Sequence, residues 1–358
     1  MKIGIYDPYL DTMSGGEKYM LSIALCLQEN HEVTIFWDKT PVESICQLAK
    51  ERFDFDLSRL QFAPSIFSKD VSLLHRLKES EKYDEIILLS DGSIPVLACR
   101  LIVHFQSPML WLQGKSIKSR LKLHRVKHII CNSRFTKSFI DNIFATDSVV
   151  VYPPVSLQGS FDPAKKENII LNVGRFGIYQ AGSSLKKQDV LADTFRILVA
   201  GGLKKWKLVL VMAVMDKDRE AVEKFKEKYK DLPIEFVINP PSHDLWQWYE
   251  KARIYWHAAG FGEDIATHPD RAEHFGMATV EAMGVGAVPI VVNAGGQKEI
   301  VTDGQNGRLW NTLEELQSFT LEAIARPHEL EEMVQAGLKT SKEFSFERFC
   351  HEITSLVA

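Results

Sequence analysis

Residues 168–176 read Asn-Ile-Ile-Leu-Asn-Val-Gly-Arg-Phe, a short apolar run that ends in a glycine and an arginine. Its apolar residues are continuous rather than alternating with polar ones, which is typical of a strand buried on both faces of a parallel sheet. We therefore predict a strand over Asn168–Val173. Because ligands of such sheets bind beyond the carboxyl ends of the strands, we expect Gly174 and Arg175 to lie near a ligand.

Similar runs recur on both sides of this stretch, with amphipathic segments between them. They are Lys2–Asp7, Val33–Trp37, Glu85–Ser90, Leu101–His104, Ile129–Asn132, Val149–Tyr152, Lys207–Met212, Ile234–Ile238, Ile254–His257 and Val288–Val292. Strand–helix alternation twice over predicts an α/β protein with two Rossmann-like, doubly wound parallel-sheet domains. The prolines at 153 and 154 mark the boundary. We place the domains at 1–160 and 161–343, with the ligand site in the cleft between them and a C-terminal helix, 344–358, packing back toward the first domain.

Composition limits the classes of protein to consider. The chain has 358 residues, of which 45% are hydrophobic and 25% charged, close to the average of soluble globular proteins. Its formal net charge of −4 argues against a dedicated nucleic-acid binder, so no nucleic-acid partner is expected. The five cysteines are scattered and odd in number, which favours free thiols in a reducing compartment. Signal-peptide and membrane-spanning patterns are lacking, and we expect a cytoplasmic location.

Two loops invite a phosphate-binding interpretation. Gly15 and Gly16 lie between the first predicted strand and an amphipathic helix, where glycines let the backbone approach an anion at a helix N-terminus. The loop is not G-x-G-x-x-G, so the dinucleotide fingerprint is missing, and a plain tight turn remains an alternative. Gly114-Lys115-Ser116 resembles the end of a P-loop, but Met109 stands where that motif needs glycine, and we reject it.

The segment from Glu273 to Gly284 reads Glu-His-Phe-Gly-Met-Ala-Thr-Val-Glu-Ala-Met-Gly. From Gly276 onward it predicts a buried helix of small and apolar residues whose single carboxylate, Glu281, needs a partner. Glu273 precedes Glu281 by eight positions, or about 12 Å of helical rise. That span suits a ligand crossing the helix N-terminus with a diphosphate at its positive end. A structural glutamate capped by backbone amides is the alternative.

Cations precede this segment in the chain. Arg175 follows a strand and Lys186 precedes the next predicted helix, positions from which each could bind phosphate oxygens. Lys187 is better interpreted as a solvated surface lysine. The acidic and histidine-containing loop 260–271 allows a metal site, but its spacing is unordered, and we favour a solvated lid and expect no metal.

These residues together resemble glycosyltransferase family 4, in its bacterial type. The resemblance rests on residues 172–176, 186–189 and 273–284, Pro289, residues 294–301 and the turn 304–307, and more loosely on residues 15–16, 132–133 and 152–154. The family has the GT-B architecture, in which two Rossmann-like domains face a central cleft, and it retains anomeric configuration. Its E-x7-E motif is present as Glu273 and Glu281. Met212-Ala213 replaces the family's usual glycine, and loop 260–271 is longer than the family's turn.

The resemblance implies a retaining hexosyltransferase that uses a nucleotide-diphosphate sugar and needs no cofactor. It places the acceptor on the N-terminal domain and the donor on the C-terminal domain. Arg175 and Lys186 would hold the donor's phosphates, Glu281 its ribose, and Glu273 would lie beside the transferred sugar. His104 would lie by the donor sugar and the acceptor, although such a histidine is more often structural. The remaining donor-binding residues that it implies are Gly15, Gly16, Phe275, Gly276 and Met277.

A basic segment gives the first domain a charge unlike the rest of the chain. Residues 92–140 contain nine Lys and Arg residues and no Asp or Glu, so the remainder of the chain carries −13. Lys118, Lys122 and Arg125 share a predicted helical face next to an apolar cluster beginning at Met109. This pattern fits an anionic membrane surface contacted through residues 109–127, or an acceptor glycan or lipid-phosphate-linked sugar. An ordinary solvated helix is the alternative.

Other functions remain possible on the same two-domain scaffold. A sugar-nucleotide epimerase or hydrolase would consume the donor without an acceptor. A degenerate subunit would bind a nucleotide sugar without catalysis, although the presence of Arg175, Lys186, Glu273 and Glu281 argues against it. An NAD-dependent oxidoreductase is disfavoured by the missing fingerprint.

Overall fold

The computed structural model describes residues 1–155, 157–178 and 184–357. The chain forms two compact units, which we describe separately. Unit 1 comprises Met1–Pro154 and Phe346–Ala358, and unit 2 comprises Val155–Ser345. Each unit is built on a sheet in which all neighbouring strands are parallel, which confirms the predicted α/β class with two Rossmann-like domains.

The sheet of unit 1 has the strand order β3-β2-β1-β4-β5-β6-β7. The strands are β1 (Lys2–Tyr6), β2 (Glu32–Phe36), β3 (Gln61–Ala63), β4 (Glu85–Leu89), β5 (Arg100–Phe105), β6 (Val126–Cys131) and β7 (Val149–Val150). The helices are α1 (Gly15–Leu27), α2 (Val42–Phe53), α3 (Leu73–Ser80), α4 (Ile117–Leu123), α5 (Arg134–Phe144) and α13 (Phe346–Val357). The strand order reverses between β1 and β4, which places the ligand crevice of such a sheet beyond those strand ends.

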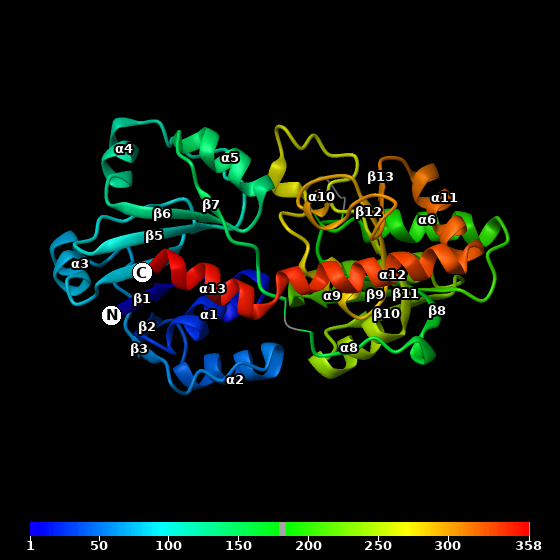
Figure 1. The fold of residues 1–358 in the computed structure, drawn as a ribbon, viewed down its shortest axis with the longest axis horizontal. Coiled ribbons are helices and arrows are strands. Elements are labelled where there is room, and N and C mark those ends of the chain that lie inside the picture. Colours follow the sequence, from blue (N-terminus) through cyan, green and yellow to red (C-terminus); the bar gives the residue numbers. More distant parts are fainter. Residues whose placement is uncertain (156, 179–183, 358) are drawn as a thin grey trace. The chain divides into compact units, whose positions relative to one another are not determined.

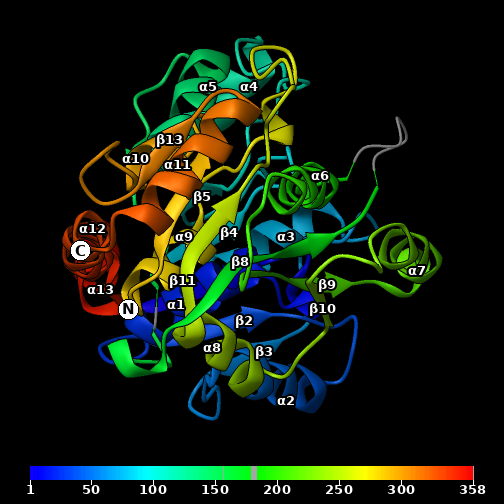
Figure 2. The ribbon, with the colours of Figure 1, turned by 90° about the vertical axis from the view of Figure 1, so that its right-hand side faces the viewer.

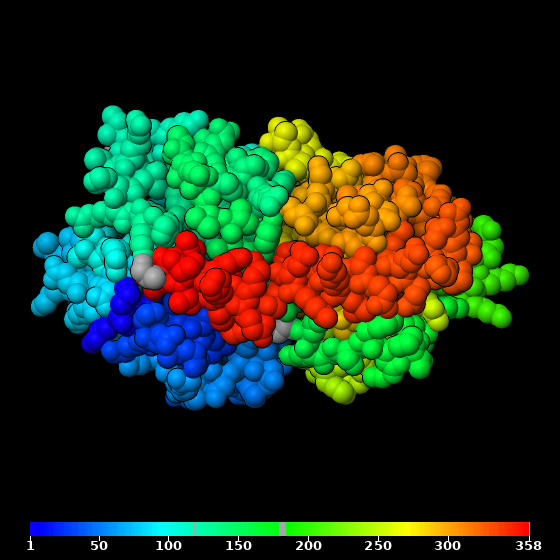
Figure 3. All heavy atoms as spheres, viewed as in Figure 1, coloured from blue at the N-terminus to red at the C-terminus, as the bar shows by residue number. Residues whose placement is uncertain are grey.

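The last helix belongs to unit 1 although the whole of unit 2 precedes it in the chain. Helix α13 lies beside α1 (Figure 1), and its outer side is exposed on the surface of unit 1, where it is red in Figure 3. Phe349, Ile353 and Val357 are buried in the core that α1 shares. A disulfide joins Cys26 of α1 to Cys350 of α13, with their Cα atoms 5.1 Å apart. The expectation that all cysteines are free thiols is therefore wrong for this pair, because 324 positions of sequence separate two residues that tertiary packing brings together.

The sheet of unit 2 has the order β10-β9-β8-β11-β12-β13. The strands are β8 (Glu167–Phe176), β9 (Lys207–Val214), β10 (Ile234–Ile238), β11 (Ala252–His257), β12 (Val288–Val292) and β13 (Arg308–Trp310), of which β8, β9 and β11 are seen side by side in Figure 2. The helices are α6 (Gln188–Ala200), α7 (Arg219–Lys228), α8 (Ser242–Lys251), α9 (Met277–Gly284), α10 (Gln297–Ile300), α11 (Leu313–Ala325) and α12 (Pro327–Ser341). Here the order reverses between β8 and β11, so the loops that follow these two strands flank the crevice.

Candidate active site

The predicted helix of small residues is present as α9, and it begins at the carboxyl edge of the unit 2 sheet. Gly276 precedes it with φ of 122°, a left-handed conformation that favours glycine. A side chain there would also lie 2.9 Å from Nε2 of the buried Gln297. Phe275 is buried against Phe344, with ring centroids 5.2 Å apart. The start of α9 is therefore closely packed, and the N-terminus of a helix carries partial positive charge that favours an anion.

Glu273 is bound by two side chains, one from the end of β11 and one from the turn that precedes α6. Lys186, which follows β8, places Nζ 2.8 Å from Oε2 of Glu273, and His257, the last residue of β11, places Nε2 3.0 Å from the same oxygen. Burial alone would raise the pKa of the Glu273 carboxyl, but Lys186 and His257 hold that pKa well below its usual range. Glu273 is therefore ionised at neutral pH, beside a cation that also suits a phosphate.

Two glycines pack directly against the backbone of the loop that contains Glu273. Gly296 donates its N–H to the Glu273 carbonyl at 2.8 Å. A side chain at Gly295 would lie 2.2 Å from that carbonyl oxygen, and one at Gly296 would lie 2.4 Å from the oxygen of His274. The loop after β12 can thus approach the Glu273 loop closely only because both residues lack a Cβ.

The second motif glutamate has a tertiary partner. Glu281, in the middle of α9, accepts a hydrogen bond from the hydroxyl of Tyr249 in α8 at 2.8 Å. Burial, and then the charge of Glu281, raise the pKa of Tyr249 well above its ordinary value. The expectation that Glu281 needs a partner is confirmed. Ribose binding by Glu281 stays a prediction.

Arg175 and Gly174 lie at the end of β8. The side chain of Arg175 is exposed, and its carbonyl accepts a hydrogen bond from Gln188 at 3.1 Å. A Cβ on Gly174 would lie 3.3 Å from Cγ of Lys186. Gly174 therefore leaves room for the stem of Lys186, whereas the side chain of Arg175, the next residue of the strand, points to the other face of the sheet. Binding of donor phosphates by Arg175 stays a prediction.

Lys187 is not the solvated lysine that the sequence suggested. Its side chain is 8% exposed, and its Nζ lies 2.5 Å from Oε1 of Glu263, which is itself 9% exposed. Arg271 binds the other oxygen of Glu263 at 2.7 Å. Loop 260–271 is therefore anchored by a buried ionic cluster, which sequence spacing could not reveal. The described residues contain no group of three or more His, Cys, Asp or Glu side chains that could hold a metal ion.

Gly15 and Gly16 form the N-terminus of α1 in unit 1. Glu17 accepts the backbone N–H of Ser14 at 2.6 Å and so closes the loop before the helix. The carbonyl of Gly16 accepts a hydrogen bond from Nε2 of Gln106 at 2.9 Å, and a Cβ on Gly16 would lie 2.2 Å from the Gln106 amide oxygen. A side chain at position 16 would therefore displace the end of the Gln106 side chain and break this hydrogen bond. Donor binding by Gly15 and Gly16 stays a prediction.

His104 lies in the core of unit 1. Its ring stacks on Tyr19 with centroids 4.0 Å apart, and Nδ1 lies 3.2 Å from the carbonyl oxygen of Ile130. Burial lowers the pKa of His104 to about 3, so the ring is neutral at pH 7. Nε2 is buried without a hydrogen-bond partner among the described residues. These contacts account for a structural histidine, and a role for His104 beside the donor sugar stays a prediction.

The sequence interpretation missed the two side chains that complete the unit 2 site. His257 carries the signal that singled out His104, a histidine at the carboxyl end of a buried strand, and could have been found by it. Tyr249 gives no such signal, because an aromatic residue in an amphipathic helix is ordinarily part of the core. Gln297 is likewise fully buried, and it accepts a hydrogen bond from Thr279 of α9 at 2.9 Å.

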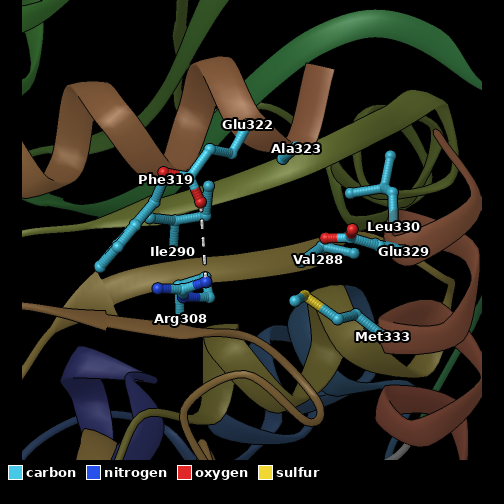
Figure 4. A pocket seen from close by; sticks show the side chains of 9 residues that line it. All are labelled: Val288, Ile290, Arg308, Phe319, Glu322, Ala323, Glu329, Leu330 and Met333. Atoms are coloured by element: carbon cyan, nitrogen blue, oxygen red, sulfur yellow. Dashed lines mark ion pairs between the residues drawn. The ribbon is translucent and has the colours of Figure 1, made fainter. Parts of the chain in front are cut away.

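A pocket elsewhere in unit 2 is not part of this site. It lies between β12 and β13 on one side and α11 and α12 on the other (Figure 4). Its cation, Arg308, already binds Asp303 at 3.1 Å, stacks 3.7 Å from the ring centre of Phe319 and pairs with Glu322 at 3.9 Å, as the dashed line shows. The predicted site residues are absent from its lining, and we do not place the active site there.

The family comparison gives the class of protein to which this fold and site belong. Residues 157–336 match the model of the family Glycosyl transferases group 1, and the chain belongs to that family. The matched region contains every predicted site residue of unit 2.

Relatives and solved structures refine this assignment. The GDP-Man:Man(3)GlcNAc(2)-PP-Dol alpha-1,2-mannosyltransferase of Dictyostelium discoideum is 27% identical over 257 residues, which make up 64% of this chain and 47% of the relative. The Homo sapiens protein of the same description is 24% identical over 238 residues, 62% of this chain and 45% of its own. The chain thus spans about half the length of these relatives. The crystal structure of Anabaena HepE in complex with UDP aligns with a TM-score of 0.76 at 15% identity, covering 100% of this chain and 99% of that one, which shows the GT-B fold.

Proposed function

We propose that the protein is a retaining glycosyltransferase of family 4 that transfers a hexosyl group from a nucleotide-diphosphate sugar to an acceptor hydroxyl. The observation that carries this proposal is the contact of Lys186 and His257 with Glu273 at the start of α9, with Glu281 on the same helix. An ionised carboxylate, a cation and a helix N-terminus meet where the strand order reverses, as binding of a sugar diphosphate requires.

Each group has a separate task in the proposed reaction. Arg175, Lys186 and the N-terminus of α9 stabilise the charge that develops as the bond between the sugar C1 and the diphosphate oxygen breaks. The acceptor oxygen forms its new bond to C1 on the same face, and its proton passes to the departing diphosphate. Glu273 lies beside the sugar, and Glu281 accepts hydrogen bonds from the ribose. Since fixed cations neutralise the leaving group, we expect transfer without an added divalent metal, with EDTA leaving the rate unchanged.

The donor is tested by thermal shift against UDP, GDP, ADP and their sugars. A nucleotide at 100 times its Kd should stabilise the folded chain by about 2.7 kcal/mol, and a panel without any stabilising member would refute the proposal. The HepE structure contains UDP and the mannosyltransferases are described with GDP-Man, so both bases belong in the panel.

Two substitutions separate binding from transfer. Glu273→Ala should abolish transfer while nucleotide binding survives, and Glu281→Ala should weaken nucleotide binding first. Glu220→Ala, which changes an exposed glutamate of α7 paired with Lys224, serves as the control. Wild-type transfer by Glu273→Ala would contradict the assignment.

The anomeric configuration of the product, measured by NMR, distinguishes retention from inversion. Consumption of the donor in the absence of an acceptor would indicate a hydrolase or an epimerase.

We further propose that the acceptor is a glycan or a lipid-phosphate-linked sugar, reached from a cytoplasmic position at the inner face of the membrane. In the segment 109–127, Trp111 is 68% exposed, Ile117 79% and Leu121 71%, beside the exposed cations Lys115, Arg120, Lys122 and Arg125. The side chain of Lys118 lies outside what the structure describes. Exposed apolar residues among cations suit an anionic lipid surface.

Vesicle sedimentation tests the membrane contact. No helix in the described part of the chain has the length and apolar character needed to cross a bilayer. Binding to anionic vesicles should therefore depend on the surface patch, fall with salt and weaken in Trp111→Ser/Leu121→Ser. Equal partitioning to neutral and anionic vesicles would contradict the idea.

A further inference from the structure

Lys187 adopts a backbone conformation that is unfavourable for lysine. Its φ of 56° lies in the left-handed region, immediately after Lys186 and immediately before α6. Residues other than glycine are strained at such positive φ values. They keep this conformation only where the surrounding structure stabilises it. The N–H of Lys187 donates to the carbonyl of Ser184 at 3.2 Å within the turn, and the strain that remains at Lys187 points to a further restraint from outside it.

The buried cluster around Glu263 provides that restraint. Glu263 binds Nζ of Lys187 through Oε1 at 2.5 Å and Nη1 of Arg271 through Oε2 at 2.7 Å. The side chains of Lys187 and Glu263 are more than nine-tenths buried, so removing the carboxylate charge would leave a buried ammonium without its counter-charge. The ammonium would lower its free energy most easily by moving into water, and the backbone turn would move with it.

That turn also determines the position of the neighbouring lysine. Lys186 binds Glu273 at 2.8 Å while Lys187 binds Glu263, so two consecutive lysines engage two carboxylates ten positions apart in the chain. A rotation of the turn would shift both contacts together. Lys186 is one residue along the chain from the strained position, whereas Glu273 is fixed independently by His257 and Gly296.

We propose that Glu263 is a positioning residue for the donor site: by holding Lys187 in its left-handed turn, it fixes Lys186 against Glu273 and ties loop 260–271 to the same turn. The inference rests on the proposed function, because it assigns Glu263 to the site that the donor phosphates would occupy. Glu263 itself is given no contact with the donor.

The test is a rescue experiment on the full chain with Glu263→Gln, Lys187→Gly and the double variant. Glu263→Gln should raise the KM for the nucleotide sugar about ten-fold while kcat changes less than two-fold, since Lys186 is misplaced but the reacting groups are intact. Lys187→Gly removes the buried charge and is relaxed at positive φ, so in the Glu263→Gln background it should restore most of the lost affinity. Glu220→Gln, which breaks an exposed ion pair in the same unit, should match the wild type.

A merely structural role of Glu263 predicts other results. Loss of folded protein would lower the apparent kcat and leave KM unchanged, and a KM raised by Glu263→Gln that Lys187→Gly leaves raised would show that the turn at Lys187 does not transmit the effect. Either result, or a wild-type KM in Glu263→Gln, would overturn the inference. If the wild-type chain binds and transfers no nucleotide sugar, the proposed function itself fails and Glu263 loses its assigned role with it. Denaturant midpoints of the wild type and the four variants separate instability from loss of positioning.

Discussion

Replacing Gly296 by alanine should disturb the candidate site through one contact. The φ of Gly296 is −71°, which alanine adopts freely, so the effect is purely steric. The new Cβ would lie 2.4 Å from the His274 oxygen and 2.5 Å from Cα of Phe275. Ordinary van der Waals contacts of a Cβ are 3.4–4 Å, so the two backbones must separate by at least about 1 Å. The hydrogen bond from Gly296 to Glu273, 2.8 Å long, would be stretched by the same movement.

The expected magnitude follows from that displacement. Overpacking costs about 1–3 kcal/mol, and the weakened hydrogen bond adds about 1 kcal/mol. A shift of about 1 Å at Glu273 should lower the transfer rate about 100-fold. Urea denaturation measures the first effect and initial rates of product formation the second.

Gly337→Ala is the matched control for this substitution. Gly337 lies within α12, where the nearest atom to a new Cβ is Cβ of Met283 at 3.6 Å. Alanine there should stabilise the chain by about 1 kcal/mol and leave transfer unchanged. Wild-type stability and transfer in Gly296→Ala would refute the reasoning, because the close approach would then not fix Glu273.

Three further outcomes are expected. Tyr249→Phe, which removes the hydroxyl bound to Glu281, should lower the free energy of unfolding by about 2 kcal/mol and weaken nucleotide binding in calorimetry; unchanged values would show that the contact is dispensable. Burial, followed by the nearby charge of Glu17, raises the pKa of Asp7 from 3.8 to about 7. The protonated carboxyl therefore contributes fully to the stability of the folded chain at low pH, and this contribution is lost as the pH rises through 7. Asp7→Asn should therefore raise the urea midpoint more at pH 8 than at pH 5, and an equal change at both would contradict the shift. Cys350→Ser, which opens the disulfide to Cys26, should lower the unfolding free energy by about 2–5 kcal/mol and abolish any effect of reductant on the midpoint.

The sequence by itself determined the parallel α/β architecture and the helix that carries the motif glutamates. A short continuous apolar run such as the one at β8 is typical of a strand that is buried on both faces of a parallel sheet. The small-residue run after Gly276 likewise predicted the buried helix α9. The runs at β3 and β13 escaped notice, because each strand has three residues and forms an edge of its sheet, too short for a period to show.

Tertiary structure alone decided which side chains meet. Lys187 looks like a surface lysine by composition, but its carboxylate partner lies 76 positions away in the chain. Tyr249 reaches Glu281 from another helix, and Cys26 reaches Cys350 across the whole length of unit 2. The physical reason is that sequence periodicity reports which face of an element is buried, whereas the partner of a buried charge or thiol depends on how distant elements pack. The identity of Glu273 was readable from the sequence, and its ionised, doubly bound state was set by the folded chain.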